Sequence, residues 1–358
     1  WLTFKLALVA QFLISTVVHF LVDIRSSADL QYVMAVAKDI AKYMNGYKVI
    51  VNKSTVPVGT GQIVKRVIEE NQTTSYPFDI VSNPEFLREG AAVYDFMHPD
   101  RVVIGTDSDR AIEIMKSVYR VLFLNQKTPF LFTSIETAET IKYASNAFLA
   151  MKVTFINEIA ALCEKVGANV VDVARGIGMD GRIGNKFLNP GPGYGGSCFP
   201  KDTRALAKIG RKYGAPMTLV ETTIQANEAI KVRMVDKIVH AIGDISGKTI
   251  GILGLAFKPE TDDMRDAPAL VILPELEKRG AQLRVYDPQA MKEAKWRLKD
   301  INRIVFCENE YQAGEGADAL VILTEWNQFR SLDLKQLKIN SFLALNLQPD
   351  FYKLINHI

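Results

Sequence analysis

Residues 47–70 read YKVIVNKSTVPVGTGQIVKRVIEE, and this stretch decides the fold class. Its first part, Tyr47–Asn52, is a short β-branched run bounded by polar residues, which predicts a buried strand. STVPVGTG predicts a turn, and the residues from about Gly61 to Glu70 predict a helix. A strand that runs through a turn into a helix is the repeating unit of α/β proteins with parallel sheets.

The same alternation continues on both sides of this unit. Ala28–Asn45 has the spacing of an amphipathic helix, and the short apolar runs Phe78–Val81 and Val102–Ile104 predict two further strands. Strands alternating with helices indicate a parallel sheet with crossover connections. We therefore expect a partial Rossmann-like α/β domain over residues 1–136.

The pattern changes at Thr137. From there to about Val166 apolar residues recur at helical spacing without an internal Gly or Pro, which predicts one long helix, a spine between domains or subunits. Further helices are predicted before Gly176 and over Leu206–Tyr213 and Leu219–Val239. A central helical and catalytic domain is thus expected over residues 137–240.

Alternation of strands and helices returns after Gly247. KTIGILGLAF (residues 248–257) predicts a strand that runs into a glycine-containing turn. Ala269–Arg279 predicts a helix, while Gln282–Tyr286 and Ala319–Leu323 predict strands. We expect a second Rossmann-like α/β domain over residues 241–358, with ligands beyond the carboxyl ends of its strands.

Composition limits the possible functions. The chain has 358 residues, 48% hydrophobic and 23% charged, with a net charge of +3, which indicates a globular protein of two or three domains and no nucleic-acid partner. Three cysteines without a CxxC pair, and only four histidines, predict a reducing, cytoplasmic compartment and no metal site. Leu6–Val22 is apolar but short for a membrane span, so we expect no membrane partner.

The segment NPGPGYGGSCFPKD (Asn189–Asp202) carries the strongest chemical signal. Four glycines and three prolines in fourteen residues exclude a helix or a regular strand. Such a loop lets backbone approach a ligand closely and presents Cys198, with Lys201 and Asp202 just beyond it. A nearby cation favours the reactive thiolate, so we predict a nucleophile rather than an inert cysteine in a structural turn.

Two polar pairs at helical spacing are weaker signals. Lys142 and Asn146 share one face of the long helix and would suit oxyanion stabilisation or acid–base work, although a solvated surface pair has the same spacing. Glu85 and Glu89 in SNPEFLREG would share a helix whose N-cap is Asn83, with Pro84 at its first position. Two carboxylates there would equally serve the helix dipole.

No convincing dinucleotide fingerprint occurs in the sequence. GPGYGG formally matches G-x-G-x-x-G, but no strand precedes it and its prolines suit no phosphate-binding turn. GTGQIV at Gly59–Val64 lacks the third glycine.

Taken together, several segments resemble the UDP-glucose dehydrogenase branch of the UDP-glucose/GDP-mannose dehydrogenase family. They occur in family order and cover most of residues 27–337, and GGSCFPKD is the most specific of them. The segments are NKSTVPVGTG, SNPEFLREGAAVYDFMHPDRVVIG, AETIKYASNAFLAMKVTFINEIA, GRIGNKFLNPGPGYGGSCFPKD, GLAFKPETDDMRDAP and ILTEWNQF.

The resemblance implies an NAD-dependent four-electron oxidation of UDP-glucose to UDP-glucuronate, as in nucleotide-sugar metabolism and polysaccharide biosynthesis. Cys198 would form a thiohemiacetal and then a thioester. Lys142 and Asn146 would hold the C6 oxygen. The other implied catalytic residues are Asp202 with Thr55 for proton transfer and Glu85 for thioester hydrolysis.

The resemblance also implies ligand contacts and a partner. We expect a homodimer through the long helix, with Arg182 reaching the substrate across the dimer interface. The implied cofactor-binding residues are Thr55, Glu89, Lys201 and Arg265. The implied substrate-binding residues are Glu85, Phe86, Leu87, Lys142, Asn146, Arg182, Phe187, Leu188, Tyr194, Gly195 and Lys258.

Both ends of the chain depart from the family pattern. Residues 1–26 look unrelated to the strand and G-x-G-x-x-G turn with which the family begins, and ALNLQPDFYKLINHI (residues 344–358) replaces a strand and an Asp-Gly-Arg turn. The hypothesis is therefore a truncated chain that binds NAD poorly. The alternatives are an impaired remnant that binds nucleotide sugar, or a related GDP-mannose or UDP-N-acetylhexosamine dehydrogenase.

Overall fold

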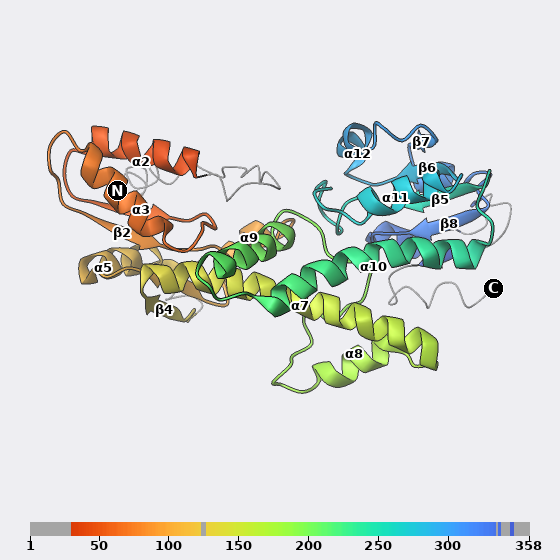
Figure 1. The fold of residues 1–358 in the computed structure, drawn as a ribbon, viewed down its shortest axis with the longest axis horizontal. Helices are drawn as coiled ribbons and strands as arrows, with labels where there is room; N and C mark the ends of the chain where they lie inside the picture. The colour runs from red at the N-terminus through yellow and green to blue at the C-terminus, as the bar shows by residue number, and fades with distance from the viewer. Residues whose placement is uncertain (1–29, 123–126, 334–335, 338–343, 347–358) are drawn as a thin grey trace. The chain divides into compact units, whose positions relative to one another are not determined.

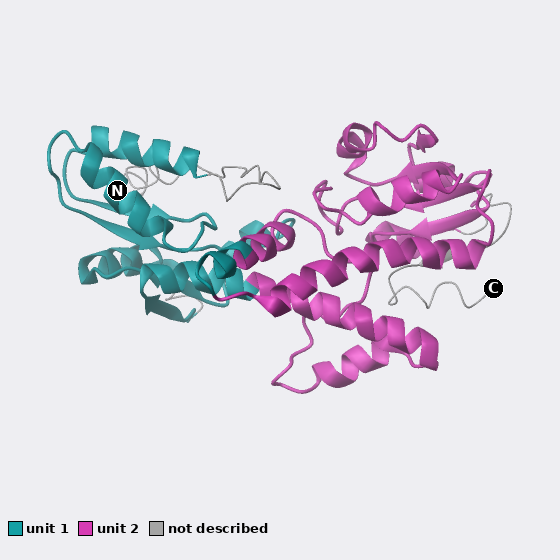
Figure 2. Cartoon of the chain, viewed as in Figure 1, with its two compact units in different colours: residues 1–145, 208–214 teal, residues 146–207, 215–358 magenta. Residues whose placement is uncertain are grey.

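The computed structural model describes residues 30–122, 127–333, 336–337 and 344–346. The chain divides into two compact units, one of residues 1–145 and 208–214, the other of residues 146–207 and 215–358 (Figure 2). The apolar run Leu6–Val22 and the departure over residues 1–26 lie outside the described residues, as does most of the carboxyl-terminal departure.

The first unit contains a four-stranded sheet in the order β1-β2-β3-β4. All three strands predicted here are confirmed, while β4 was not predicted. Pairs β1/β2 and β3/β4 are parallel, but β2 and β3 run antiparallel with Ser82 opposite Gly105, so the prediction of an all-parallel sheet is wrong here. The strands are β1 (Lys48–Asn52), β2 (Phe78–Ser82), β3 (Val102–Gly105) and β4 (Phe130–Thr133).

Helices cover both faces of this sheet (Figure 1). Because successive strand residues point to opposite faces, Ile80 and Val81 pack into different clusters. Ile80 lies with residues of α2 (Gln31–Tyr43) and α3 (Thr60–Asn71), whereas Val81 lies with residues of α5 (Asp109–Val118). The short helix α4 (Ala92–Met97) has no buried residue.

Long helices make up the middle of the chain, as predicted. They are α7 (Ile135–Val166), α8 (Val170–Gly178), α9 (Phe199–Lys212) and α10 (Thr218–Ile242). By length and apolar composition α7 is the one described helix that would span a membrane, which is weak evidence because core helices pass the same test. Helix α9 begins earlier than predicted, so the segment FPKD is helical; Pro200 fits because the first turn of a helix needs no amide hydrogen from it.

The carboxyl-terminal part of the second unit is a parallel sheet in the order β7-β6-β5-β8-β9. The predicted strands and the helix α11 (Ala269–Lys278) are confirmed. The strand β9 (Ala344–Asn346) corrects the expectation that the family's strand is missing from residues 344–358. The other elements are β5 (Thr249–Leu253), β6 (Gln282–Tyr286), β7 (Ile304–Phe306), β8 (Ala319–Ile322), α12 (Met291–Arg297), α13 (Glu310–Gly314) and the 3-10 turn η1 (Asn327–Ser331).

The central strand β5 fixes where this sheet can receive a ligand. The successive β5 residues Ile252 and Leu253 pack into different clusters, with α11 on the first side and α13 on the second. A Cβ on Gly251 would lie 2.6 Å from the Ala313 carbonyl oxygen, so α13 approaches the strand closely only because this residue is glycine. The chain order reverses at β5, with β6 on one side and β8 on the other, and ligands of such sheets bind beyond the carboxyl ends of the strands at that point.

Candidate active site

The loop that follows β2 carries the first group of predicted residues. Residues 83–88 are not helical, so the prediction of Asn83 as an N-cap with Pro84 at the first helical position is wrong. The reason is that the Asn83 side chain, 1% exposed, is bonded elsewhere. Its Nδ2 donates to the Val103 carbonyl oxygen at 2.7 Å, and its Oδ1 accepts from the Tyr119 hydroxyl at 2.5 Å and from Lys53 Nζ at 3.1 Å.

Burial shifts the protonation equilibria of both partners of Asn83. It raises the pKa of Tyr119 to about 12, against an opposing hydrogen bond to Asn83. It lowers the pKa of Lys53 to about 8, with the charge of Glu85 acting in the opposite direction. Near neutral pH the network therefore holds a hydroxyl and an ammonium that both donate to one amide oxygen.

Anchoring Asn83 places Glu85 and Phe86 beside the long helix. Glu85 Oε1 lies 3.6 Å from Lys142 Nζ, and its Oε2 accepts from the Leu87 amide at 2.6 Å. Lys142, 3% exposed, has its ammonium 5.1 Å from the centre of the Phe86 ring. Lys142 is therefore no solvated surface lysine, and the first unit brings four of the predicted residues together.

Other predicted residues of this unit lie in loops at the same edge of the sheet. Thr55 lies between β1 and α3, and Glu89 lies in the turn before α4. Because Glu89 is not in a helix, its predicted i, i+4 relation to Glu85 is wrong.

The turn before α3 is occupied by a carboxylate. Glu139 of α7, 3% exposed, accepts from the amides of Gly59 and Gly61 at 2.6 Å and 2.9 Å. Burial raises the pKa of Glu139 to about 7, although both amide hydrogen bonds act to lower it. A helix N-terminus is an anion site, and here a side chain fills it, which agrees with the view that GTGQIV is no phosphate-binding fingerprint.

The second unit places Cys198 directly before α9. The Cys198 carbonyl oxygen accepts from the Asp202 amide at 3.0 Å, so Cys198 is the N-cap residue of this helix. Helix N-termini favour negative charge, which suits a thiolate nucleophile. The Ser197 hydroxyl lies 3.5 Å from the Cys198 sulfur.

A buried carboxylate lies one turn into the same helix. Asp202, 1% exposed, accepts from Asn146 Nδ2 at 2.5 Å and from Lys201 Nζ at 2.5 Å. The ammonium of Lys201 thus pairs with Asp202, while its expected effect on the Cys198 thiol stays a prediction. Two of the predicted catalytic residues, Asn146 and Asp202, are in direct contact, and Lys142 lies one turn before Asn146 on the continuous helix α7.

Main-chain contacts hold the glycine loop that precedes Cys198. Tyr194 and Asn227 exchange two hydrogen bonds, the Tyr194 amide to Asn227 Oδ1 at 2.8 Å and Asn227 Nδ2 to the Tyr194 carbonyl at 3.1 Å. The Gly196 amide donates to the Arg265 carbonyl at 2.7 Å. A Cβ on Gly195 would lie 2.7 Å from the Asp266 carbonyl oxygen, so only glycine permits this approach.

The remaining predicted substrate contacts are an apolar cluster and two cations, Arg182 and Lys258. Phe187 and Tyr194 lie about Phe199 with ring centres 6.0 Å and 5.9 Å away, and Leu188 is buried. Arg182, whose side chain is 89% exposed, pairs with Asp180 at 2.6 Å. Lys258 lies 5.5 Å from the centre of the Phe257 ring, beyond the carboxyl end of β5.

Two observations bear on a metal or cofactor. Within the described ranges, no group of His, Cys, Asp or Glu side chains could hold a metal ion. Asn52 ends β1, and its side-chain Nδ2 is buried without a hydrogen-bond partner there. A buried donor without a partner at the carboxyl end of a parallel strand fits a polar ligand such as a dinucleotide.

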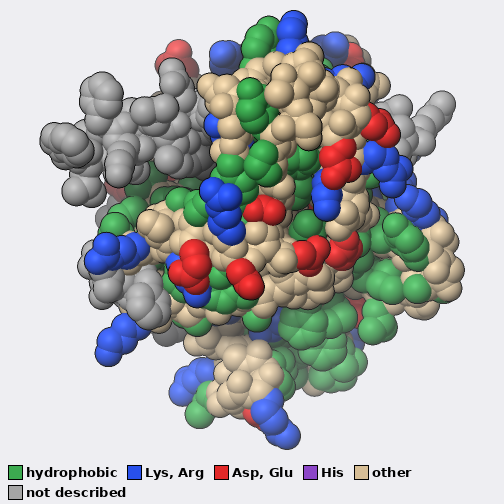
Figure 3. Space-filling view, turned by 90° about the vertical axis from the view of Figure 1, so that its left-hand side faces the viewer, with side chains coloured by type: hydrophobic (Ala, Val, Ile, Leu, Met, Phe, Trp, Pro, Cys, Tyr) green, Lys and Arg blue, Asp and Glu red, His purple; other side chains and the backbone are tan. Residues whose placement is uncertain are grey.

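On the face in Figure 3, basic and acidic side chains are interspersed.

Sequence reasoning missed the residues that hold the two loops in place. Lys53 and Asn83 follow strands of the first sheet, and position at a strand's carboxyl end is a signal that would have found them. Tyr119, Asn227 and Asp266 carry no local signal, because each acts on a loop distant in sequence.

Three family models match the chain. They describe the UDP-glucose/GDP-mannose dehydrogenase family: its NAD binding domain over residues 16–123, its central domain over residues 136–229 and its UDP binding domain over residues 251–349. The first match confirms NAD as the expected cofactor, and it begins within the stretch 1–26 that looked unrelated by sequence.

Individual relatives are similar over most of the chain. The UDP-glucose 6-dehydrogenase of Rhizobium meliloti (strain 1021) is 57% identical over 314 residues, 87% of this chain and 71% of that protein. UDP-glucose 6-dehydrogenase TuaD of Bacillus subtilis (strain 168) is 49% identical over 311 residues, 87% and 66% of the two chains. A solved UDP-glucose dehydrogenase from Pyrobaculum islandicum has a TM-score of 0.82 at 36% identity and covers 90% of this chain and 73% of its own. The predicted fold class is thereby confirmed.

Proposed function

The chain belongs to the UDP-glucose/GDP-mannose dehydrogenase family, and from that premise we propose that it oxidises UDP-glucose to UDP-glucuronate through a covalent adduct on Cys198. The observation that carries the proposal is the arrangement at the start of α9. A cysteine caps the helix, and a fully buried Asp202 is held by Asn146 and Lys201 one turn later. A lone cysteine packed as filler would need neither.

Cys198 captures the aldehyde produced by the first oxidation. Its thiolate adds to the C6 carbon, the carbonyl π electrons move to the oxygen, and that oxygen takes up a proton to give a thiohemiacetal. The second oxidation leaves a thioester on Cys198. Holding the aldehyde as an adduct prevents its escape between the two steps.

Polar side chains carry the charge and the protons of these steps. The Lys142 ammonium and the Asn146 amide stabilise negative charge on the C6 oxygen. Asp202, with Thr55 and a water molecule, takes up and returns the proton of the C6 hydroxyl. Glu85 activates the water that hydrolyses the thioester, releasing the carboxylate and restoring the Cys198 thiol.

NAD supplies the hydride acceptor when it is bound. The orphaned Nδ2 of Asn52 at the end of β1 supports a polar ligand there, with Thr55 and Glu89 in the adjoining loops. Lys201 and Arg265 are the further residues that we assign to cofactor contact. The strength of NAD binding is measurable by calorimetry, and a micromolar dissociation constant would contradict the hypothesis of a weak site.

The UDP moiety is proposed to lie at the carboxyl ends of β5 and β8. Lys258 supplies a cation there, and Phe187, Leu188, Tyr194 and Gly195 line the sugar side. UDP-glucose is preferred over GDP-mannose and UDP-N-acetylhexosamines, because the relatives at 57% and 49% identity are UDP-glucose 6-dehydrogenases. The domains proposed are residues 1–136 for NAD, 137–240 for catalysis and 241–358 for UDP.

A homodimer through α7 is part of the proposal. Phe148, Phe155 and Leu162 follow one another at intervals of seven and are 57%, 49% and 56% exposed, which is the spacing of a helix–helix seam. The exposure of Arg182 supports its proposed contact with substrate bound to the second copy. Sedimentation of Phe155→Glu should then show a monomer, while a dimer that persists would count against this seam.

A cytoplasmic location fits the free cysteines.

The direct test is NADH formation from UDP-glucose, followed by absorbance beside Cys198→Ala. We expect two NADH per sugar from the unaltered chain and at most one from the variant, because only the second oxidation passes through the Cys198 adduct. Binding of UDP-glucose by calorimetry without any NADH would instead support the alternative, a nucleotide-sugar-binding remnant.

A further inference from the structure

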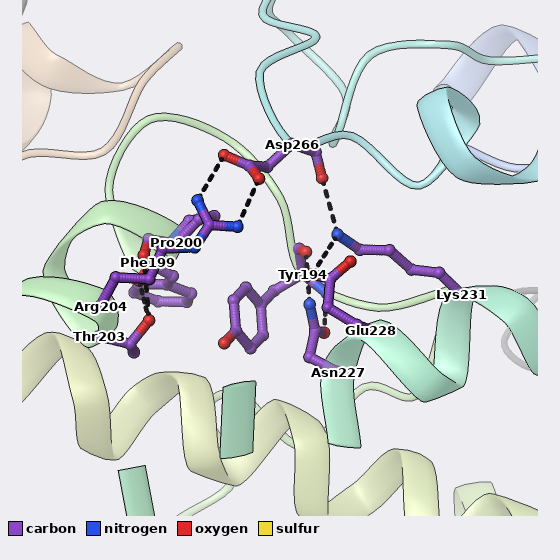
Figure 4. A network of polar contacts seen from close by, with 9 residues as sticks. All are labelled: Tyr194, Phe199, Pro200, Thr203, Arg204, Asn227, Glu228, Lys231 and Asp266. Carbon is purple, nitrogen blue, oxygen red and sulfur yellow. Dashed lines mark hydrogen bonds and ion pairs between the residues drawn. The ribbon is translucent and has the colours of Figure 1, made fainter. Parts of the chain in front are cut away.

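A network of ion pairs and hydrogen bonds joins α9 and α10 to the turn that contains Arg265 and Asp266 (Figure 4). The Asp266 carboxylate accepts from Arg204 Nη2 at 2.8 Å and from Arg204 Nη1 at 3.3 Å. The Asp266 carbonyl oxygen accepts from Lys231 Nζ at 3.1 Å. One residue thus receives a cation from each helix, one at its side chain and one at its main chain.

The backbone of Asp266 is in a conformation that needs such support. Its φ is +49°, in the left-handed region, which costs a residue with a side chain on the order of 1 kcal/mol. Such a conformation persists only where its surroundings fix it. Lys231, 1% exposed, is itself costly to bury, and its ammonium is held by Glu228 at 2.9 Å as well as by Asp266.

The same turn supports the loop that presents Cys198. The Arg265 carbonyl accepts the Gly196 amide at 2.7 Å. Cβ atoms on Gly195 would lie 2.7 Å from the Asp266 carbonyl oxygen and 3.0 Å from the Ala267 Cα. Any movement of the turn is therefore transmitted directly to the backbone two residues before the thiol.

We propose that Asp266, Arg204 and Lys231 are positioning residues that hold the turn at residues 265–267 and thereby fix Cys198. Arg204 links the turn to Cys198 by a second route, because it belongs to α9, the helix that Cys198 caps. The turn also carries Arg265, so a ligand at that arginine and the position of the thiol are coupled. Only the kinetic part of the test rests on the proposed function.

The first measurement needs no substrate. The full chain is treated with iodoacetamide, and alkylation of Cys198 is followed by peptide mass spectrometry in Asp266→Asn, Arg204→Gln and their double variant. We expect a freed loop to react ~3-fold faster or more in each, because reaction depends on access to the thiol. The double variant should be no faster than the faster single variant, since both break one contact.

Internal and external controls accompany this measurement. Cys163 and Cys307, each 5% exposed, must stay unreactive, which shows that a variant is folded. Arg233→Gln removes a comparable pair, Arg233 to Glu164 at 2.8 Å in the same unit, and should react at the unaltered rate. Unaltered rates in Arg204→Gln, whose side chain is 34% exposed and tolerant of change, would overturn the proposal even if Asp266→Asn fails to fold.

The second measurement separates positioning from general structure. In NADH formation we expect kcat to fall ~10-fold in Asp266→Asn and Arg204→Gln, with little change in KM, because a small misplacement of a reacting group slows chemistry more than binding. Arg204→Lys should recover part of the loss. Raised KM at unchanged kcat would overturn the proposal. Failure of the unaltered chain to form NADH would refute the proposed function alone, since the alkylation comparison needs no turnover.

Discussion

Two loops carry the proposed chemistry, and they are held in place by different means. The loop at residues 83–88 is fixed by one buried side chain, Asn83, whose amide group makes three hydrogen bonds. The loop at residues 193–198 is held at Tyr194 by the Asn227 side chain, and at Gly195 and Gly196 by close packing that leaves no room for a Cβ. The first should therefore be sensitive to loss of polar atoms and the second to gain of a single carbon.

The largest effect is expected from Gly196→Ala. The new Cβ would lie 2.6 Å from the Phe257 ring, and the φ of +81° disfavours any side chain. Strain and crowding together should lower the free energy of unfolding by about 2–4 kcal/mol, measured by urea denaturation.

Gly167→Ala separates the two causes in that experiment. Gly167 has a similar φ of +72° but nothing within 4 Å of a Cβ, so only the strain of about 1 kcal/mol should remain. Equal losses in the two variants would mean that the close contact of Gly196 with the Phe257 ring does not matter.

Asn83→Ala should give the next largest loss. It removes three hydrogen bonds, those to the Tyr119 hydroxyl, the Lys53 ammonium and the Val103 carbonyl, at an expected cost of about 2–3 kcal/mol of unfolding free energy. Tyr119→Phe removes the bond to Asn83 and the one accepted from Lys53 Nζ at 3.1 Å, but it leaves Asn83 bonded to Val103 and Lys53, so it should cost only about 1 kcal/mol. Denaturation midpoints that fall equally in both variants would contradict a network centred on Asn83.

A pH series should reveal the buried carboxylate of the first unit. The pKa of Glu139 is raised from its ordinary 4.5 to about 7, so between these values the folded chain keeps a proton that the unfolded chain releases. The free energy of unfolding should therefore fall as pH rises from about 5 to about 7 and level off above, by an amount on the order of 1 kcal/mol once solvent screening is allowed for. Urea midpoints of Glu139→Gln should lack this slope, and parallel curves would refute the assignment.

The smallest effect is expected at the surface. Lys116 and Glu113 pair at 2.7 Å, but their side chains are 46% and 71% exposed. Lys116→Gln should change the unfolding free energy by less than about 0.5 kcal/mol. A loss comparable to that of Tyr119→Phe would mean that burial is not what distinguishes the loop network from ordinary surface pairs.

The sequence was sufficient for the elements with strong local patterns. Short apolar runs such as Phe78–Val81 form strands, and the uninterrupted apolar periodicity of α7 forms a helix. In both cases the local pattern is enough to determine the element without contacts from other parts of the chain. The prediction of Cys198 as a nucleophile rests on a similarly local signal, a single cysteine in a glycine-rich loop, and it stays a prediction.

The failures occur where tertiary contacts override local signals. Asn83 has the residue type and spacing of a helix cap, but Tyr119, 36 residues away, takes its oxygen. The start of α9 was missed because Pro200 was treated as a helix breaker rather than as a first-turn residue. The left-handed backbone of Asp266 had no sequence signal, since the contacts that support it come from Arg204 and Lys231, distant in sequence.

The carboxylate at the start of α3 has a consequence for how the first unit folds. Glu139 gives the Gly59–Gly61 turn the hydrogen-bond acceptors that a dinucleotide's phosphate would otherwise supply. The acceptors of these two amides therefore belong to the chain itself, and the shape of the turn does not depend on how much cofactor the cell provides. Adding a glycine to this turn would therefore not be enough to make it a phosphate site. The Glu139 side chain would first have to be replaced, because it already binds the two amides.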